Sequence, residues 1–183
     1  RGKGAESLRW FIGYIRSLAK PMGKVYMDIG EPVVLAKAPP PDDKLALSKI
    51  AFEVAVEANH VTPITIPSLV TMSLLGASPR ALTEAEVVQD LSVLLRWAEA
   101  RNLRISRDFD RAYADQMQGP LGLMIEEGMV TRYDEGPDVV YGIEQEQHAV
   151  ASYYRNTIIH FFVNKAIIEL ALLKTSETEG RAA

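Results

Sequence analysis

The stretch that decides the fold is His148–Leu173, which reads HAVASYYRNTIIHFFVNKAIIELALL. It contains no glycine or proline, so we expect one unbroken helix of about 39 Å at a rise of about 1.5 Å per residue. Its apolar positions nearly encircle the axis, which is typical of a helix that is buried or that lies against a membrane. These positions are Tyr153, Tyr154, Ile158, Phe161, Phe162, Val163, Ile167, Ile168, Leu170, Leu172 and Leu173.

The polar residues of this stretch are also ordered. Asn156, His160 and Asn164 recur every four residues, which predicts one thin polar line along the helix. Lys165 and Glu169 have the spacing of an i,i+4 ion pair elsewhere on its surface.

Composition indicates a folded chain and excludes several kinds of site. With 183 residues, 48% of them hydrophobic, the chain can bury one good core, or one domain plus a fragment of another. The absence of cysteine excludes disulfides and thiolate metal sites. The three histidines have no carboxylates at metal-ligand spacing, so we expect neither a metal nor a cofactor. No apolar run reaches about 18 residues, so we expect no helix that spans a membrane.

The charge is distributed unevenly along the chain. The net charge is −4, but residues 1–24 carry six Lys/Arg against one Glu. Such a basic segment could face phosphates or an anionic lipid surface, and an ordinary solvated helix face is an equally good interpretation. The chain starts with Arg1 and shows no signal peptide, which favours a piece of a longer polypeptide.

The first forty residues predict half of an α/β unit. Residues 5–20 have helical spacing, with Arg9, Arg16 and Lys20 on the side opposite the apolar stripe. Residues 24–29 alternate and predict a strand. A single strand needs a sheet to join, which is a second reason to expect that the chain begins inside a domain. The prolines of residues 38–41 predict an extended, semi-rigid boundary between residues 1–41 and 42–183.

The remainder predicts short helices and one hairpin. Asp42 or Asp43 should cap a helix that runs to about Asn59, with Leu45, Ile50, Val54 and Ala58 inside. Further helices are expected over residues 67–75, 108–118 and 121–127, and over 83–101, where Thr83 and Glu86 have the spacing of a capping box. The apolar face of this last helix should comprise Val87, Val88, Leu91, Leu94, Leu95 and Ala98. Residues 129–133 and 139–143 should pair as a hairpin.

The sequence lacks the usual signatures of catalysis. There is neither a P-loop nor G-x-S-x-G, and Gly2-Lys3-Gly4 has no third glycine and no preceding strand. Acyl transfer to an alcohol commonly uses a histidine base, in one known form within H-x-x-x-x-D. The residues five beyond the three histidines are Thr65, Tyr153 and Lys165, so no histidine fits this form.

Residues 83–143 also support an alternative from another class of protein. The order of helix, helix and two-stranded hairpin is typical of a winged helix, and nearby arginines favour nucleic-acid binding. Winged helices also serve as packing modules, and the acidic hairpin tip (Asp134, Glu135, Asp138) would repel phosphates. We therefore keep a non-enzymatic, winged-helix nucleic-acid-binding module as the alternative and expect no nucleic-acid partner. The arginines are Arg96, Arg101, Arg104, Arg107 and Arg111.

Three stretches together resemble the membrane-associated, bacterial-type glycerol-3-phosphate acyltransferases. Residues 23–32 (GKVYMDIGEP) are similar to the late part of glycerolipid acyltransferase domains. Residues 59–82 hold an N…P…L…RAL pattern that resembles the segment downstream of the catalytic domain. Residues 152–160 (SYYRNTIIH) resemble a string characteristic of the C-terminal region of the family. The resemblance covers nearly all of the chain.

The resemblance implies a parent enzyme that moves a fatty acyl group from acyl-CoA or acyl-carrier protein to the sn-1 hydroxyl of glycerol 3-phosphate. The H-x-x-x-x-D histidine of the family acts as general base and lies upstream, so we assign no catalytic residue here. The expected partner is the upstream acyltransferase domain of the same polypeptide. The implied location is peripheral or monotopic, on the cytoplasmic side of the cell membrane.

The expected fold class is mainly α with a small β component. Residues 1–41 would be the end of an α/β acyltransferase domain, and residues 42–183 a helical C-terminal domain with a winged-helix-like hairpin. This piece should have a structural, docking or membrane-facing role and be inactive alone.

Several residues have two interpretations each. Arg155 could bind the phosphate or carboxylate of a substrate; an ion pair between the long helix and the catalytic domain is favoured. Tyr153 and Tyr154 could line an acyl path, although core packing with a hydroxyl partner is favoured. For His160 we favour a satisfied interior histidine over a base.

Two groups of residues are candidates for contact with lipid. Arg9, Arg16 and Lys20 could meet lipid headgroups or CoA phosphates, or form an exposed face without a ligand. The segment Phe161-Phe162-Val163 could rest on a bilayer, and burial against other helices explains it equally well.

Overall fold

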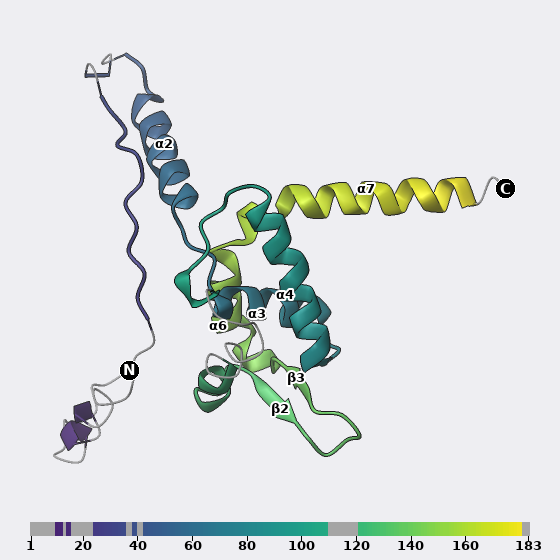
Figure 1. Ribbon diagram of the computed structural model, residues 1–183. Coiled ribbons are helices and arrows are strands. Elements are labelled where there is room, and N and C mark those ends of the chain that lie inside the picture. The colour runs from purple at the N-terminus through teal and green to yellow at the C-terminus, as the bar shows by residue number, and fades with distance from the viewer. Residues whose placement is uncertain are drawn as a thin grey trace.

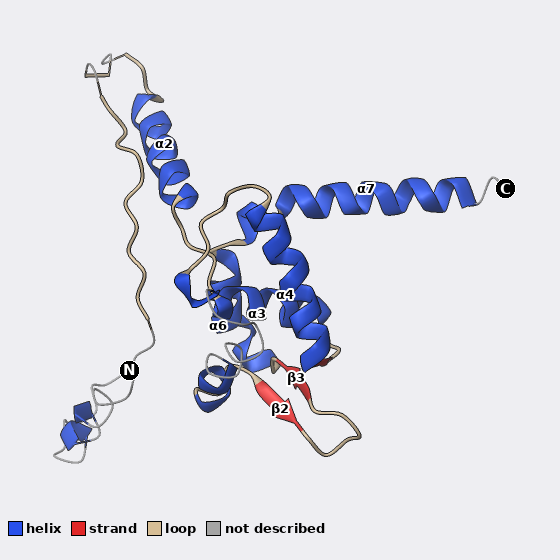
Figure 2. Cartoon of the chain, viewed as in Figure 1, coloured by secondary structure: helices blue, strands red, loops and turns tan. Residues whose placement is uncertain are grey.

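The computed structural model describes residues 10–12, 14–15, 24–35, 38–39, 42–109 and 121–180. The described chain is mainly helical, with a small three-stranded antiparallel sheet (Figures 1 and 2). This confirms the predicted class of a mainly α fold with a small β component. Of the predicted first helix, residues 10–12 and 14–15 are helical, and the rest lies outside the described residues. The helix predicted over 108–118 also falls largely outside them.

Two capped helices form the centre of the packed part of the chain. Helix α3 (Ile66–Ala77) begins where the Thr65 side chain accepts a hydrogen bond from the Ser68 amide. Helix α4 (Glu84–Glu99) begins at Thr83, whose hydroxyl accepts from the Glu86 amide while the Glu86 carboxylate accepts from the Thr83 amide. This reciprocal pair satisfies amides that the helix itself cannot, and it confirms the predicted capping box.

The hydrophobic core lies between α3, α4, the sheet and helix α6 (His148–Asn156). The predicted apolar face of α4 is confirmed, because Val87, Leu91, Leu95 and Ala98 are buried and Val88 and Leu94 pack against the core. From residues 121–126, a short helical segment as predicted, Leu121 and Met124 are buried in the same core.

The sheet contains the predicted hairpin and one further strand. Strands β2 (Thr131–Tyr133) and β3 (Val140–Gly142) pair antiparallel, which confirms the hairpin. Strand β1 (Leu82–Thr83) pairs with β3 on its other side, and the order is β1-β3-β2. The sequence did not predict β1, because two residues directly before a helix cap give no alternation to detect.

The prediction of one long helix is wrong, because the α-helix is interrupted between residues 157 and 162. Helix α6 ends at Asn156, a 3-10 turn η3 spans Ile159–Phe161, and helix α7 (Val163–Gly180) follows. The break lets Ile158 and Phe162 both pack into the core. It also exposes the Phe161 carbonyl to the indole of Trp97, whose Nε1 donates to that oxygen at 3.2 Å. The core and this distant side chain, not a local breaker, end the helix.

The break also overturns the expectation of one polar line along the stretch. Asn156, His160 and Asn164 do not form one line, because His160 lies in η3 between the two helices. The apolar residues of α7 are exposed rather than buried within the described chain. Figure 1 shows α7 extending away from the rest of the described chain. The predicted Lys165–Glu169 ion pair is confirmed.

Helix α2 (Ala46–His60) starts later than predicted and is mostly exposed. Its N-cap is Leu45, with no side-chain cap, although Asp43 accepts a hydrogen bond from the Leu45 amide at 3.0 Å. The expectation that Leu45, Val54 and Ala58 lie inside is wrong, because α2 runs beside residues 24–35 rather than over the core (Figure 1).

Residues 24–35 are extended but belong to no sheet of the described chain. The predicted strand therefore has the backbone shape of a strand, but it pairs with no named strand of the described chain. An ion pair between Asp28 and Arg104 ties the segment to the packed part of the chain. Gly30 lies close to α2, since a Cβ there would be 3.3 Å from the Glu57 carbonyl oxygen. The absence of a side chain at Gly30 allows this segment to approach the backbone of α2 closely.

Candidate functional site

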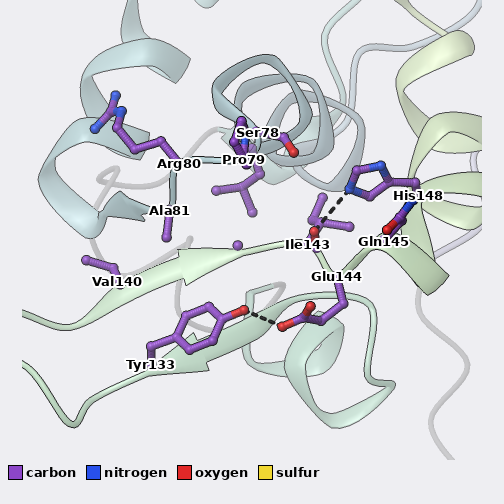
Figure 3. A pocket seen from close by; sticks show the side chains of 12 residues that line it. Ser78, Pro79, Arg80, Ala81, Tyr133, Val140, Ile143, Glu144, Gln145 and His148 are labelled. Atoms are coloured by element: carbon purple, nitrogen blue, oxygen red, sulfur yellow. Dashed lines mark hydrogen bonds between the residues drawn. The ribbon is translucent and has the colours of Figure 1, made fainter.

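One cavity of the described chain lies where four segments meet. It has a volume of about 550 Å³, between the end of α3, the residues before β1, the β2–β3 hairpin and the start of α6. Figure 3 shows its lining, in which apolar side chains such as Pro79 and Ile143 alternate with polar ones. The peptide bond between Ser78 and Pro79 is cis.

Tyr133 and Glu144 point toward one another at one side of this pocket (Figure 3). The Tyr133 hydroxyl donates a hydrogen bond to the Glu144 carboxylate. This bond, with smaller contributions from burial and from the charge of Glu144, raises the pKa of Tyr133 above its usual value. The phenol therefore stays protonated at neutral pH, and Glu144 keeps an internal partner.

His148, the first residue of α6, lines the opposite side. Its Nε2 lies 3.1 Å from the Ile143 carbonyl oxygen. A carbonyl oxygen only accepts, so Nε2 carries the proton in this bond and Nδ1 is the remaining acceptor. The partner of this histidine is a backbone carbonyl, not the carboxylate that commonly orients a catalytic base.

Arg80, which supplies positive charge at the pocket, forms an ion pair with Glu86. Nη1 of Arg80 lies 2.6 Å from Oε1 of Glu86. The Thr83 amide first, then the Arg80 guanidinium and the Thr83 hydroxyl, lower the pKa of Glu86 to about 2. Glu86 is therefore ionised at neutral pH and neutralises Arg80. Arg80 is thus paired with Glu86 and Glu144 is hydrogen-bonded to Tyr133, so the pocket offers hydrogen bonds and apolar contact.

Arg155 and the two tyrosines before it form a surface site on α6. The Arg155 guanidinium donates to Oδ1 of Asn156, from Nε at 3.2 Å and from Nη2 at 3.0 Å. The rings of Tyr153 and Tyr154 meet edge to face, with centroids 5.7 Å apart. Tyr153 is 70% exposed, so the predicted core packing is wrong for it. No acidic side chain of the described residues pairs with Arg155, so both interpretations of Arg155 stay predictions.

Comparison with known proteins decides the family. The model of the glycerol-3-phosphate acyltransferase C-terminal region matches residues 1–182. The chain belongs to this family. It is 35% identical over 182 residues to the putative acyltransferase plsB1 of Mycobacterium tuberculosis and of Mycobacterium bovis, covering 96% of this chain and 29% of those proteins. It is 25% identical over 205 residues to the glycerol-3-phosphate acyltransferase of Shewanella halifaxensis, covering 98% of this chain and 24% of that protein.

The chain thus spans less than a third of the length of these curated relatives. No solved structure matches it. Family membership agrees with the resemblance found in residues 23–32, 59–82 and 152–160. The comparisons give no support to the winged-helix nucleic-acid alternative.

The structure describes some of the apolar and basic residues that were candidates for contact with lipid. Arg9, Arg16 and Lys20 lie outside the described residues. Phe162 is buried and Phe161 packs against the core, so burial explains both phenylalanines. Over the part of the chain that the structure describes, no helix is long and apolar enough to cross a bilayer.

His160 differs from its prediction. Its ring lies against Phe161, with centroids 4.0 Å apart, and its Nε2 is buried. Among the described residues this nitrogen has no hydrogen-bond partner, so the predicted satisfied histidine is wrong within them.

Sequence reasoning did not identify the pocket. Arg80, Tyr133, Glu144 and His148 come from separate elements, and no motif spacing connects them. Only the pairing of β3 with both β1 and β2 brings them together. A local signal was available for Arg80 alone, three residues before the capping box that contains its partner Glu86.

Proposed function

We propose that this chain is the C-terminal region of a glycerol-3-phosphate 1-O-acyltransferase of phospholipid biosynthesis. The parent enzyme transfers a fatty acyl group from acyl-CoA or acyl-carrier protein to the sn-1 hydroxyl of glycerol 3-phosphate. The general base lies in an upstream acyltransferase domain of the same polypeptide. The chain described here does no chemistry alone and serves to support and dock that domain.

The observation that carries this proposal is the surface of residues 24–35. Val25, Met27 and Ile29 are between 86% and 93% exposed, while the intervening Tyr26 and Asp28 are half-buried. Within the described chain, no backbone hydrogen bond joins residues 27–35 to another segment. An extended segment with an exposed apolar face is a template for aggregation unless a sheet receives it. This supports residues 1–41 as the end of an α/β domain whose other strands lie upstream.

The histidines support the absence of chemistry in this region. His148 is bonded to a backbone carbonyl, and His160 lies against Phe161. His60 has a carboxylate neighbour, with Nδ1 3.6 Å from Oε1 of Glu57, but the pair lies on the exposed surface of α2 and away from the pocket. None of the three combines a carboxylate partner with a cavity that could hold a substrate.

The test is an acyl-transfer assay on two proteins, the 183-residue chain and the full polypeptide from the source organism. Both receive glycerol 3-phosphate with acyl-CoA or acyl-carrier protein, and the acylated position of the product is determined. We expect sn-1 product from the full polypeptide and none from the chain alone. Replacement of the upstream H-x-x-x-x-D histidine by alanine is the control for background turnover. Robust turnover by the chain alone would contradict the support role.

The proposal places the protein at the cytoplasmic face of the cell membrane, as a peripheral or monotopic protein. The excess of six Lys/Arg over one Glu in residues 1–24 supports this, because basic segments are attracted to anionic lipid. Co-sedimentation of the full polypeptide with phosphatidylglycerol vesicles should fall with rising salt. Equal binding to uncharged phosphatidylcholine vesicles would argue against this role for the basic segment.

Arg155 has two roles to separate in the full polypeptide. If its guanidinium binds the substrate phosphate, Arg155→Ala should raise KM for glycerol 3-phosphate and Arg155→Lys should restore part of the affinity. If Arg155 instead pairs with the upstream domain, the alanine variant should lower thermal stability at unchanged KM. Steady-state kinetics and a melting curve on the same samples distinguish these roles.

A further inference from the structure

Helix α7 presents a long apolar surface that nothing in the described chain covers. Ile167, Ile168, Leu170, Leu172 and Leu173 are between 51% and 66% exposed. The helix contacts η3 at its start and then extends away from the packed core (Figure 1). A helix so rich in exposed apolar side chains requires an occupant, since monomeric soluble proteins rarely expose contiguous patches of this kind.

The arrangement of these side chains limits what the occupant can be. At about 100° per residue, Leu170 and Leu172 lie about 160° apart around the axis. Ile167 lies on the Leu170 side, and Ile168 on the Leu172 side. The helix therefore has apolar surface on two nearly opposite sides, with the Lys165–Glu169 ion pair between them.

A lipid surface fits this pattern poorly. A helix that lies in the membrane interface buries one apolar face and keeps a lysine- or arginine-rich face in water. Helix α7 has two apolar sides, and its two lysines are outnumbered by three glutamates. It is also not apolar enough to span a bilayer.

A second copy of this chain fits poorly as well. The seam that starts at Val163, Ile167 and Leu170 meets Lys174 and Glu177 at its next two positions. A coiled coil needs apolar residues at these positions over about three heptads or more. Self-association through this helix would therefore end after roughly two turns.

We propose that α7 docks into the upstream acyltransferase domain of the same polypeptide, which covers both of its apolar sides. This rests on the proposed function for the identity of the partner. The matched region is 29% of the length of the plsB1 relatives, so most of such a polypeptide lies outside it and is available to cover the helix. Covalent linkage adds an effective concentration of order millimolar, so docking needs no exceptional affinity.

The test uses the full polypeptide with a photoreactive benzoylphenylalanine at position 170 or 172. A third variant with the same group at Glu135 is the control, because Glu135 is exposed in the connection between β2 and β3, outside α7. Irradiation followed by mass spectrometry should join both α7 positions to peptides of the upstream domain, at several times the yield from position 135. Adducts only with lipid, only between two copies, or no more than the control gives, would overturn the proposal.

A second measurement needs no substitution and therefore no assumption about folding of a variant. Trypsin should cleave after Lys174 at least tenfold more slowly in the full polypeptide than in the 183-residue chain. Equal cleavage rates would overturn the proposal. Cross-links without acyl transfer to glycerol 3-phosphate would contradict the proposed function alone, and acyl transfer without cross-links would contradict the docking alone.

Discussion

Helices α3 and α7 contain similar apolar residues, but those of α3 are buried and those of α7 are exposed. In α3, Ile66, Leu69, Val70 and Leu74 are no more than 2% exposed, whereas the isoleucines and leucines of α7 are more than half exposed. The difference does not come from composition. Helix α3 contacts α4, α6 and β3, whereas the main contact of α7 within the described chain is with η3, directly before it. Burial is thus a property of the partners that a helix finds.

The comparison also separates two kinds of stability. Residues of the packed core should determine the unfolding of this chain, and residues of α7 should determine its attachment to something else. Substitutions in the two regions should therefore differ in their effect on unfolding.

Truncation of a core leucine should be far more damaging than truncation of an α7 leucine. Leu91→Ala removes a side chain that is fully buried in α4 and should cost about 2–5 kcal/mol of unfolding free energy. Leu170→Ala is the matched control, and it should change the stability of the 183-residue chain by less than about 0.5 kcal/mol. Urea denaturation of both variants measures the difference. A comparable loss at Leu170 would show that α7 already has a partner in the isolated chain.

Trp97 of α4 forms a hydrogen bond at the junction between the two regions. Trp97→Phe removes the indole donor of the Phe161 carbonyl and should cost about 1 kcal/mol. The control is Trp10→Phe at the other tryptophan of the chain, which is exposed and should change stability less. Denaturation followed by circular dichroism checks both. Unchanged stability in Trp97→Phe would mean that the break in the helix is held by Ile158 and Phe162 alone.

This junction shows why part of the fold was predictable and part was not. The capping box at Thr83 and Glu86 and the apolar face of α4 depend on residues a few positions apart, so the sequence predicted them. The break after Asn156 depends on Trp97, whose partner is 64 residues away in the sequence. Periodicity over residues 148–173 contains no trace of that contact.

The same reasoning explains the two exposed regions and the pocket. Residues 24–29 alternate correctly for a strand, and α7 has the composition of a buried helix. Within the described chain, however, no strand pairs with residues 24–29, and the isoleucines and leucines of α7 remain exposed. The pocket was not predicted for a different reason, because its residues are all in the described chain. Tyr133, Glu144 and His148 are each unremarkable in the sequence, and only the pairing of β3 with both β1 and β2 places them at one cavity.

The start of α4 gives the packed region a dependence on acid. The Thr83 amide, the Arg80 guanidinium and the Thr83 hydroxyl depress the pKa of Glu86 from 4.5 to about 2. A depressed pKa stabilises the folded state above about pH 4.5 and loses that contribution as pH falls toward 2. The stability difference between the native chain and Glu86→Gln should therefore shrink over this window. A pH-independent difference would show that the hydrogen-bond geometry, not the charge, matters at this cap.

The smallest effect is expected at the rim of the pocket, where Tyr133 meets Glu144. The hydrogen bond raises the pKa of Tyr133, so its contribution is present below the usual tyrosine pKa of about 10 and is lost as pH rises through the folded value. Ultraviolet titration of the native chain should show one tyrosine that ionises later than the rest, and Tyr133→Phe should remove that phase. Tyr153→Phe is the control and should leave it in place, because Tyr153 is largely exposed on α6. If a late phase persists in Tyr133→Phe, another tyrosine has the raised pKa. The hydrogen bond between Tyr133 and Glu144 would then not be its cause.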